Sequence, residues 1–292
     1  MNILSLLTFT IFAAESLISP LTSDYQVPIA ELSKPTISFS ELEVPTPSPT
    51  PISTPSPSLT PTPTQLPIRT TKKSTITIAL LGDSMIDTLG PDAPHLANAL
   101  KKTYPNTTFI IKNLGVGGKP INDGIDRITN GYTYLGTSYP PLMSQNPDVV
   151  VLESFGYNAT GTGQGAIDHH WLELARAVDV IKSNLPNAKV VIAATIAPNS
   201  TRFGDGAPGL AFSSEDKQKR TTNIKQYIET AIKFAKSEHI PLADAYDASL
   251  DGSDDGKLAY INSGDHIHYS DAGRTLMGSK IAGAIVGNKL LE

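Results

Sequence analysis

The sequence predicts an α/β domain in which a parallel β-sheet carries helices on both faces. Two observations lead to this fold class. Four short apolar runs alternate along the chain with four longer stretches of helical periodicity, and no internal repeat is visible. In folds of this kind ligands bind at the carboxyl ends of the strands, so the loops that follow the apolar runs are expected to carry the functional side chains.

The four apolar runs are predicted to be buried strands. They occupy residues 75–81, 108–114, 148–152 and 188–194. The last two are too short and too rich in β-branched residues to favour helices. Helical periodicity covers residues 95–104, 166–185, 215–239 and 270–286. Ser270 and Asp271 form a good amino-terminal cap for the last of these helices.

Residues 1–16 are predicted to be a signal peptide or an amino-terminal anchor. Most of this segment is one apolar run of 12 residues, whereas a membrane-spanning helix needs about 20. Ala14 and Ser16 are the small residues that a signal peptidase reads, but the first lysine is Lys34, so no basic side chain precedes the run. The pattern favours a cleaved signal over an uncleaved anchor or neither, and hence a secreted or cell-surface protein.

Residues 17–68 are predicted to be a disordered linker, followed by one folded domain over residues 69–292. Within the linker, residues 45–67 hold 9 prolines and 10 serines or threonines in 23 positions. Such a segment cannot pack a core and favours extended conformations of about 3.1 Å per residue. It would act as a stalk about 70 Å long if its far end were attached, and as a simple tail otherwise.

Charge and cysteine content exclude several function classes. The chain has 23 basic and 28 acidic residues, a net charge of −5 without long blocks of one sign, which argues against binding to nucleic acid or to an anionic membrane surface. It has no cysteine, which excludes disulfides, thiolate metal sites and a cysteine nucleophile. Any chemistry therefore uses oxygen and imidazole groups.

The first strand is followed by Gly82, Asp83 and Ser84, which places a serine where such folds bind ligands. Taken alone, this turn is a weak signal that favours a helix cap over a nucleophile. It is not the Gly-x-Ser-x-Gly elbow of α/β-hydrolases, because Ile86 stands where the second glycine is needed. Ser84 is therefore a candidate nucleophile that needs partners elsewhere in the chain.

The loops after the second and third strands can supply hydrogen-bond donors. Residues 113–118 form a glycine-rich loop that fails the spacing of both the Walker loop and the dinucleotide motif, since Pro120 stands at a required position. Its backbone amides can still approach a ligand closely. After the third strand, Gly156 allows a turn that aims the Asn158 amide toward a developing oxyanion, although Asn158 could equally cap its own turn.

Near the carboxyl terminus, Asp265 and His268 stand three residues apart ahead of the last helix. In a turn, this spacing lets the carboxylate accept a hydrogen bond from Nδ1 of the imidazole and leaves Nε2 free to take a proton from a serine. His266 is assigned a supporting role. A metal site formed by the two histidines is the alternative, but the sequence shows no third cluster of ligands.

Together these four loops resemble the SGNH (GDSL) hydrolases over residues 75–285. The resemblance implies a flavodoxin-like, three-layer fold with five parallel strands in the order 2-1-3-4-5. It implies a serine esterase or acyl hydrolase that needs no cofactor or metal. Ser84 would be the nucleophile, His268 the base and Asp265 the residue that orients it. The oxyanion hole would consist of the backbone N–H groups of Ser84 and Gly118 and the side chain of Asn158.

One position departs from the family pattern, and one loop is a candidate for substrate selection. The family often has Asp directly after Gly-x-Asn, whereas this chain has Ala159; Glu153 or Tyr157 is expected to brace the loop instead. The long loop after the fourth strand lies on the pocket side. Candidate substrate-binding residues are Arg202, Phe203 and Tyr157.

The expected function is hydrolysis of an O-acyl ester through a covalent acyl-enzyme, on extracellular carbohydrate, envelope or lipid esters. An O-acyltransferase could use the same site, because water and an alcohol compete for one acyl-enzyme. A surface binding module that has lost catalysis is the alternative from another class. The expected partner is a small-molecule or polysaccharide ester, with tethering through the amino terminus as an option and no nucleic acid; the sequence does not specify an oligomeric state.

Two further motifs favour structural interpretations. Residues 251–256 match the first half of a calcium-binding EF-hand loop, but Asn262 stands where the bidentate glutamate is required. His169, His170 and Trp171 could line a sugar subsite, although on a helix they are more typical of surface histidines beside a packed aromatic ring.

Overall fold

The computed structural model describes residues 68–292, which form a five-stranded, all-parallel sheet flanked by helices. The strands are β1 (Thr75–Gly82), β2 (Thr108–Gly115), β5 (Val149–Glu153), β6 (Lys189–Ala194) and β7 (Leu242–Asp244). Their order across the sheet is β2-β1-β5-β6-β7, which is the expected order 2-1-3-4-5. The predicted α/β class and flavodoxin-like sheet are confirmed. The predictions for residues 1–67 concern a part of the chain outside the described residues.

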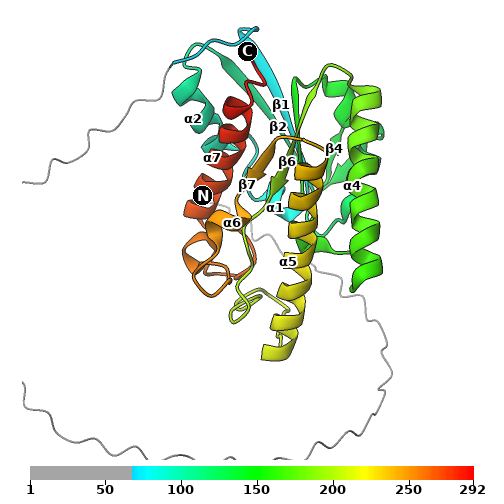
Figure 1. Cartoon of the computed structure of the whole chain (residues 1–292), viewed down its shortest axis with the longest axis vertical. Coiled ribbons are helices and arrows are strands. Elements are labelled where there is room, and N and C mark those ends of the chain that lie inside the picture. Colours follow the sequence, from blue (N-terminus) through cyan, green and yellow to red (C-terminus); the bar gives the residue numbers. More distant parts are fainter. Residues whose placement is uncertain (1–67) are drawn as a thin grey trace, which may run out of the picture. The chain divides into compact units, whose positions relative to one another are not determined.

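Helices cover both faces of this sheet, which gives three layers (Figure 1). On one face lie α2 (Pro94–Thr103) and α7 (Asp271–Gly287), which pack against each other. On the other face lie α3 (Ile121–Thr129), α4 (Gln164–Asn184) and α5 (Ser214–Ser237). The helices and strands alternate along the chain, as βαβ crossovers in a parallel sheet require.

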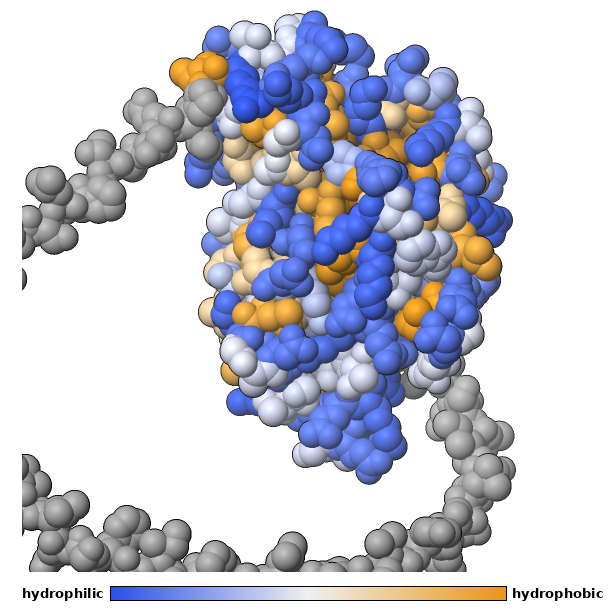
Figure 2. Space-filling model, in the orientation of Figure 1, coloured by the Kyte–Doolittle hydropathy of each residue, from blue (hydrophilic) through white to orange (hydrophobic). Residues whose placement is uncertain are grey.

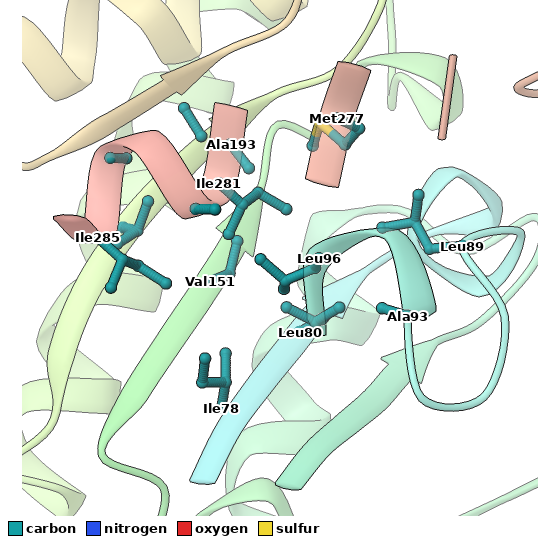
Figure 3. Packing of buried hydrophobic residues seen from close by; sticks show 14 of the residues in the cluster. Ile78, Leu80, Leu89, Ala93, Leu96, Val151, Ala193, Met277, Ile281 and Ile285 are labelled. Atoms are coloured by element: carbon teal, nitrogen blue, oxygen red, sulfur yellow. The ribbon is translucent and has the colours of Figure 1, made fainter. Parts of the chain in front are cut away.

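Side chains of β1 point alternately to the two faces of the sheet, so the strand contributes residues to the hydrophobic core on each face. Ile78 and Leu80 belong to the cluster under α2 and α7, whereas Ala79 and Leu81 belong to the cluster under the other helices. All four side chains are fully buried. Figure 3 shows the first cluster, in which Leu80 and Val151 from the sheet lie among side chains of the covering helices, including Ile281. Burial on both faces explains why the strands read as continuous apolar runs.

Shorter elements connect this framework. They are α1 (Ser84–Asp87), the antiparallel hairpin strands β3 (Tyr132–Tyr134) and β4 (Thr137–Tyr139), η1 (Leu142–Gln145), η2 (Gly156–Asn158), α6 (Tyr246–Ser249) and η3 (Leu258–Tyr260).

The sequence predicted four strands and four helices to within about two residues; β7, α3 and the β3–β4 hairpin are among the elements that it did not locate. β7 has only three residues, too few to show a period. Ile121, Ile125 and Ile128 of α3 have the apolar spacing of an amphipathic helix, so this element had a local signal despite its short length and Gly124. The β3–β4 hairpin is mostly exposed and lacks the apolar alternation of a half-buried strand pair. Tertiary contacts, more than local preference, fix β7 and the hairpin.

Strand register brings the predicted functional loops together. The last residues of β1 and β2, Gly82 and Gly115, are paired. β5 lies on the other side of β1, and its last residue, Glu153, follows the pair Leu81–Leu152. The carboxyl ends of the three central strands therefore meet, which places the loops that begin with Asp83 and Ser154 side by side.

The opposite pole of the domain holds both of its ends. Arg69 donates from its backbone N–H to the carbonyl of Thr103, and its guanidinium lies 2.9 Å from the Glu292 carboxylate. The face of the domain seen in Figure 2 is mostly hydrophilic, with hydrophobic residues in small separate patches. Within residues 68–292, none of the helices combines the length and apolar composition needed to cross a bilayer.

Candidate active site

The nucleophile candidate Ser84 begins the short helix α1, directly after β1. Asp83 caps this helix: its Oδ1 accepts a hydrogen bond of 2.7 Å from the Met85 N–H. Asp83 and Met85 are fully buried, whereas Ser84 is partly exposed. The backbone N–H of Ser84 has no acceptor among the described residues. The turn thus presents both the hydroxyl and a free amide of Ser84 to the loops around it.

His268 and Asp265 form the pair that their spacing predicts. His268 Nδ1 lies 2.9 Å from Asp265 Oδ2, and Asp265 Oδ1 accepts from the backbone N–H groups of Ile267 (2.9 Å) and His268 (3.0 Å). Burial raises the pKa of Asp265, but the hydrogen bond from His268 and these two backbone donors outweigh it and hold the pKa below its usual value. An ionised Asp265 therefore fixes the ring and leaves Nε2 available.

The loop that carries Asp265 and His268 faces the turn that carries Asp83 and Ser84. The charge of protonated His268 opposes the rise that burial causes in the pKa of Asp83 and of Asp87, the residues that flank Ser84 on α1. No hydrogen bond joins Ser84 to His268 among the described residues. Such bonds are often long in free enzymes and tighten when substrate binds. The structure thus shows the His268–Asp265 pair, and transfer of the Ser84 proton to His268 stays a prediction.

Asn158, on η2, is held by Asp83, the residue before the candidate nucleophile Ser84. Its side-chain Nδ2 donates to Asp83 Oδ2 at 2.8 Å. The sequence left open what braces this loop in place of the family's Asp, and named Glu153 or Tyr157. The direct partner is Asp83, while the Tyr157 hydroxyl donates to the carbonyl of Ile196 at 3.2 Å. One amide hydrogen of Asn158 is thereby fixed and the other remains free to donate.

The glycine loop after β2 offers one free amide. Gly118 has a positive φ of 72°, and a Cβ there would meet no atom within 4 Å, so its surroundings are open. Its N–H has no acceptor among the described residues. The N–H of Gly117, in contrast, donates to the Tyr134 hydroxyl at 3.2 Å. Of the two amides, only that of Gly118 is available to a ligand, as the oxyanion prediction requires.

Tyr134 is a residue of the site that the sequence did not single out. It comes from the β3–β4 hairpin, and its hydroxyl donates to Asp87 Oδ2 at 2.9 Å. Burial raises the pKa of Tyr134 to about 12, so the group is a neutral phenol at physiological pH. A Cβ on Gly117 would lie 3.0 Å from the Tyr134 hydroxyl and 3.8 Å from Ser84 Cβ, so the three residues meet. The only local signal was the turn at Gly136 between alternating tyrosines.

Arg127 is a second residue that the sequence did not indicate. This side chain of α3 is 3% exposed, and its guanidinium donates to the carbonyls of Gly82 (3.1 Å) and Leu114. Its Nε donates to Asp123 at 2.8 Å. Arg127 therefore ties together the ends of β1 and β2, from which the serine and glycine loops start. No sequence pattern distinguishes it from a surface arginine of a helix.

The three candidate substrate-binding residues lie in one cluster, but their roles differ. Phe203 is 7% exposed and packs between Tyr157 and Phe212, with ring centroids 6.3 and 6.1 Å apart. Arg202 is exposed, and its Nε donates to Asp205 at 2.9 Å. Phe203 therefore stabilises the loop, whereas Arg202 is the member of the set that is open to solvent.

The same loop contacts the histidine loop. His266 Nδ1 lies 2.7 Å from the carbonyl of Asp205. Gly206 has a φ of 87°, and a Cβ there would lie 2.4 Å from the carbonyl of Gly264, so only glycine fits this approach. His266 thus joins this loop to the loop that carries His268, and its supporting role in the site stays a prediction.

The two remaining motifs have structural explanations. In the residue 251–256 loop, Asp251 Oδ1 accepts from Ser253 and Asp255, so the turn satisfies its own carboxylate. Within residues 68–292 no cluster of three or more His, Asp or Glu side chains is arranged to hold a metal. The expectation of surface histidines on α4 is wrong for His170, which is 1% exposed and packs against Tyr227 with the two rings tilted by 40°.

Comparisons with known proteins identify the family of this chain and its fold. The family model of GDSL-like lipases and acylhydrolases matches residues 80–276. A search of curated protein sequences gave no match.

Among solved structures, a G-D-S-L family protein from Desulfitobacterium hafniense is 15% identical, with a TM-score of 0.50, 72% of this chain covered and 99% of the other. A GDSL-like protein from Parabacteroides merdae is 19% identical, with a TM-score of 0.53, 77% of this chain covered and 100% of the other. At these identities the structural likeness concerns the fold.

Proposed function

Because the chain belongs to the GDSL-like lipase/acylhydrolase family and is an ester-bond hydrolase, we propose that it cleaves O-acyl esters through Ser84, His268 and Asp265. The observation that carries this proposal is the 2.9 Å contact between His268 Nδ1 and Asp265 Oδ2. It orients an imidazole whose other nitrogen is free, in a loop that faces a serine at the start of a helix. A serine hydroxyl needs such a base to become nucleophilic at neutral pH.

The reaction would begin when Ser84 Oγ attacks the ester carbonyl carbon and His268 Nε2 takes the hydroxyl proton. The carbonyl oxygen becomes an oxyanion, which would accept from the backbone N–H groups of Ser84 and Gly118 and from the free amide hydrogen of Asn158. Asp265 stabilises the imidazolium that forms. These donors are fixed before the reaction starts, so little reorganisation is needed as charge develops.

Collapse of the tetrahedral intermediate would expel the alcohol, which takes the proton from His268 Nε2, and leave the acyl group on Ser84. Water then attacks the acyl-enzyme, with His268 again accepting a proton, and the carboxylic acid leaves as Ser84 is restored. An alcohol in place of water would give acyl transfer by the same steps. The site residues proposed here therefore support either acceptor, and product analysis separates them.

The proposed substrates are esters outside the cytoplasm, on carbohydrate, envelope material or lipid. The support is the apolar run within residues 1–16, which has the length of a signal peptide's apolar segment, followed by small residues at Ala14 and Ser16. Cleavage after Ser16 would give a mature protein that starts at Leu17. The intact mass of the protein from the extracytoplasmic fraction tests this, and a mass that retains Met1 would contradict it.

The proposed activity is tested with the full wild-type chain and two variants. Hydrolysis of p-nitrophenyl acetate, butyrate and octanoate is measured from about pH 5 to 9, the range that brackets an ordinary imidazole. We expect turnover in the wild type, none in Ser84→Ala, and wild-type turnover in Ser144→Ala, an exposed serine of η1. A fluorophosphonate probe should label the wild type and not Ser84→Ala. Undiminished turnover or labelling in Ser84→Ala would contradict the assignment.

A further inference from the structure

Two carboxyl side chains lie fully buried at the carboxyl ends of neighbouring strands, next to Ser84. Asp83 follows the end of β1 and Glu153 is the last residue of β5; both have no exposed surface. A Cβ on Gly82 would lie 2.8 Å from the Glu153 Cβ, which shows how closely the carboxyl ends of β1 and β5 approach each other. Two adjacent buried carboxylates repel each other and lose hydration, so we expect only one of the two to be ionised.

The hydrogen bonds indicate which of the two holds the charge. Both oxygens of Asp83 accept, Oδ1 from the Met85 N–H and Oδ2 from the Asn158 amide. Glu153 Oε1 accepts from the Ser154 hydroxyl at 2.7 Å, but Oε2 is buried without a partner among the described residues. A carboxylate with donors on both oxygens is stabilised as an anion, whereas an orphan oxygen favours a bound proton.

The groups around Glu153 offer it no cation. Burial raises the pKa of Asp83 too, but the hydrogen bonds from Met85 and Asn158 and the charges of protonated His268 and Arg127 favour its ionised form. Glu153 faces Tyr157 and Tyr269, whose pKa values burial raises well above normal, so both are neutral. His170, beside the Ser154 backbone, has its pKa lowered by burial to about 4 and is also neutral. Burial first, and the charge of Asp83 second, raise the pKa of Glu153 well above its usual value.

Glu153 also connects the two loops that supply the chemistry. The backbone N–H groups of Asp83, at the nucleophile turn, and Phe155, at the start of the Asn158 loop, approach its carboxyl group and favour its charged form, though less strongly than burial opposes it. A neutral carboxyl can accept from such donors through its carbonyl oxygen and adds no second negative charge.

We propose that Glu153 is a positioning residue that keeps its proton in the folded enzyme, so that Asp83 is the ionised member of this carboxyl pair and orients the Asn158 amide. Ionisation of Glu153 would set two negative charges against each other and displace Asp83, and with it the oxyanion donor. The effect on catalysis rests on the proposed function, whereas the retained proton is a property of the folded protein alone.

The retained proton is tested by the pH dependence of unfolding. A glutamate in the unfolded chain loses its proton near pH 4.3, so above that pH the wild type must release a proton to unfold. Relative to Glu153→Gln, the unfolding equilibrium constant of the wild type should therefore rise by up to tenfold per pH unit between pH 5 and 9. Denaturant titrations of the full chain measure it.

Glu173→Gln is the matched control for this measurement. Glu173 is also largely buried, but it lies 3.4 Å from Arg176 Nη1. It should show no such gain in stability over the wild type as pH rises. A pH-independent difference between wild type and Glu153→Gln would mean that Glu153 is ionised in the folded state and would overturn the proposal.

The positioning role is tested by the rate at which a fluorophosphonate labels Ser84 at pH 7. Gln retains the hydrogen-bonding carbonyl and is neutral, whereas Met fills a similar volume without polar atoms. We expect Glu153→Gln to be labelled at least ten times faster than Glu153→Met. Equal slow labelling of both variants, or wild-type labelling of Glu153→Met, would overturn the role. If the wild type itself is not labelled, the proposed function fails, and the unfolding experiment still decides the protonation of Glu153.

Discussion

The side chain of Asn158 donates to Asp83 Oδ2 at 2.8 Å, so the residue before the candidate nucleophile holds the candidate oxyanion donor. Asn158→Ala should lower kcat by about 10²–10³-fold, the usual effect of losing one oxyanion donor, and leave measurable residual activity. Ester hydrolysis by the purified variant measures this. Asn184→Ala, at the exposed end of α4, is the control. Wild-type kcat in Asn158→Ala would remove this residue from the oxyanion hole.

Asp265 should matter through the ring that it orients. Asp265→Asn can present an N–H to His268 Nδ1 and favour the wrong tautomer, so we expect kcat to fall by about 10³–10⁴-fold. Because the pKa of Asp265 is held below its usual value, the carboxylate stays ionised down to acidic pH, and loss of activity above about pH 5 should not come from its protonation. A pH–rate profile checks both points, with Asp251→Asn as the exposed control. A kcat within threefold of wild type would contradict the assignment.

Tyr134 should act by fixing the glycine loop. Tyr134→Phe removes the hydroxyl that accepts from Gly117 and donates to Asp87. The loop that carries the Gly118 amide is then less well held, and we expect kcat to fall about tenfold, equivalent to about 1.4 kcal/mol, with a smaller change in KM. Tyr139→Phe, on the same hairpin, lies outside this hydrogen-bond network and serves as the comparison. Equal kinetics for the two variants would count against the role of Tyr134.

The sheet framework could be predicted from sequence because it depends on local pattern, while much of the site depends on contacts between distant residues. Strand and helix periodicity located eight elements, and the Asp265–His268 pair follows from a three-residue spacing within one turn. The Asn158–Asp83 bond joins residues 75 positions apart. Tyr134 and Arg127 enter the site only because a hairpin and a helix fold against the strand ends. No periodicity encodes such contacts.

Arg127 should be needed for stability as well as for the site. Arg127→Met leaves the carbonyls of Gly82 and Leu114 buried without their donor, so we expect a loss of about 3 kcal/mol in the free energy of unfolding. The free energy of unfolding of Arg127→Lys should lie between those of the wild type and Arg127→Met, because one ammonium group cannot reproduce the planar guanidinium that reaches both strand ends. Chemical denaturation of the three proteins measures this order. Arg127→Met as stable as the wild type would show that water replaces the guanidinium.

His170 should make the protein sensitive to acid. Burial lowers its pKa from 6.5 to about 4, so the unfolded chain takes up the proton first as pH falls. The contribution of neutral His170 to the free energy of unfolding is fully present above about pH 6.5. It should decrease as the pH falls toward 4, by about 3 kcal/mol in total. His170→Leu should lack this component, whereas His169→Leu, its exposed neighbour, should keep it. Identical pH dependence in the wild type and His170→Leu would contradict this interpretation.

The contact between Arg69 and Glu292 determines how the enzyme can be presented to a large substrate. Both ends of the folded chain leave from the amino-end pole of the sheet, whereas the serine, glycine and histidine loops lie at the carboxyl-end pole. A support, a fused partner or a surface attached at either end would therefore leave the candidate catalytic loops facing away from it. The closeness of the ends also suits the domain to circular permutation, with a short linker joining Glu292 to Arg69.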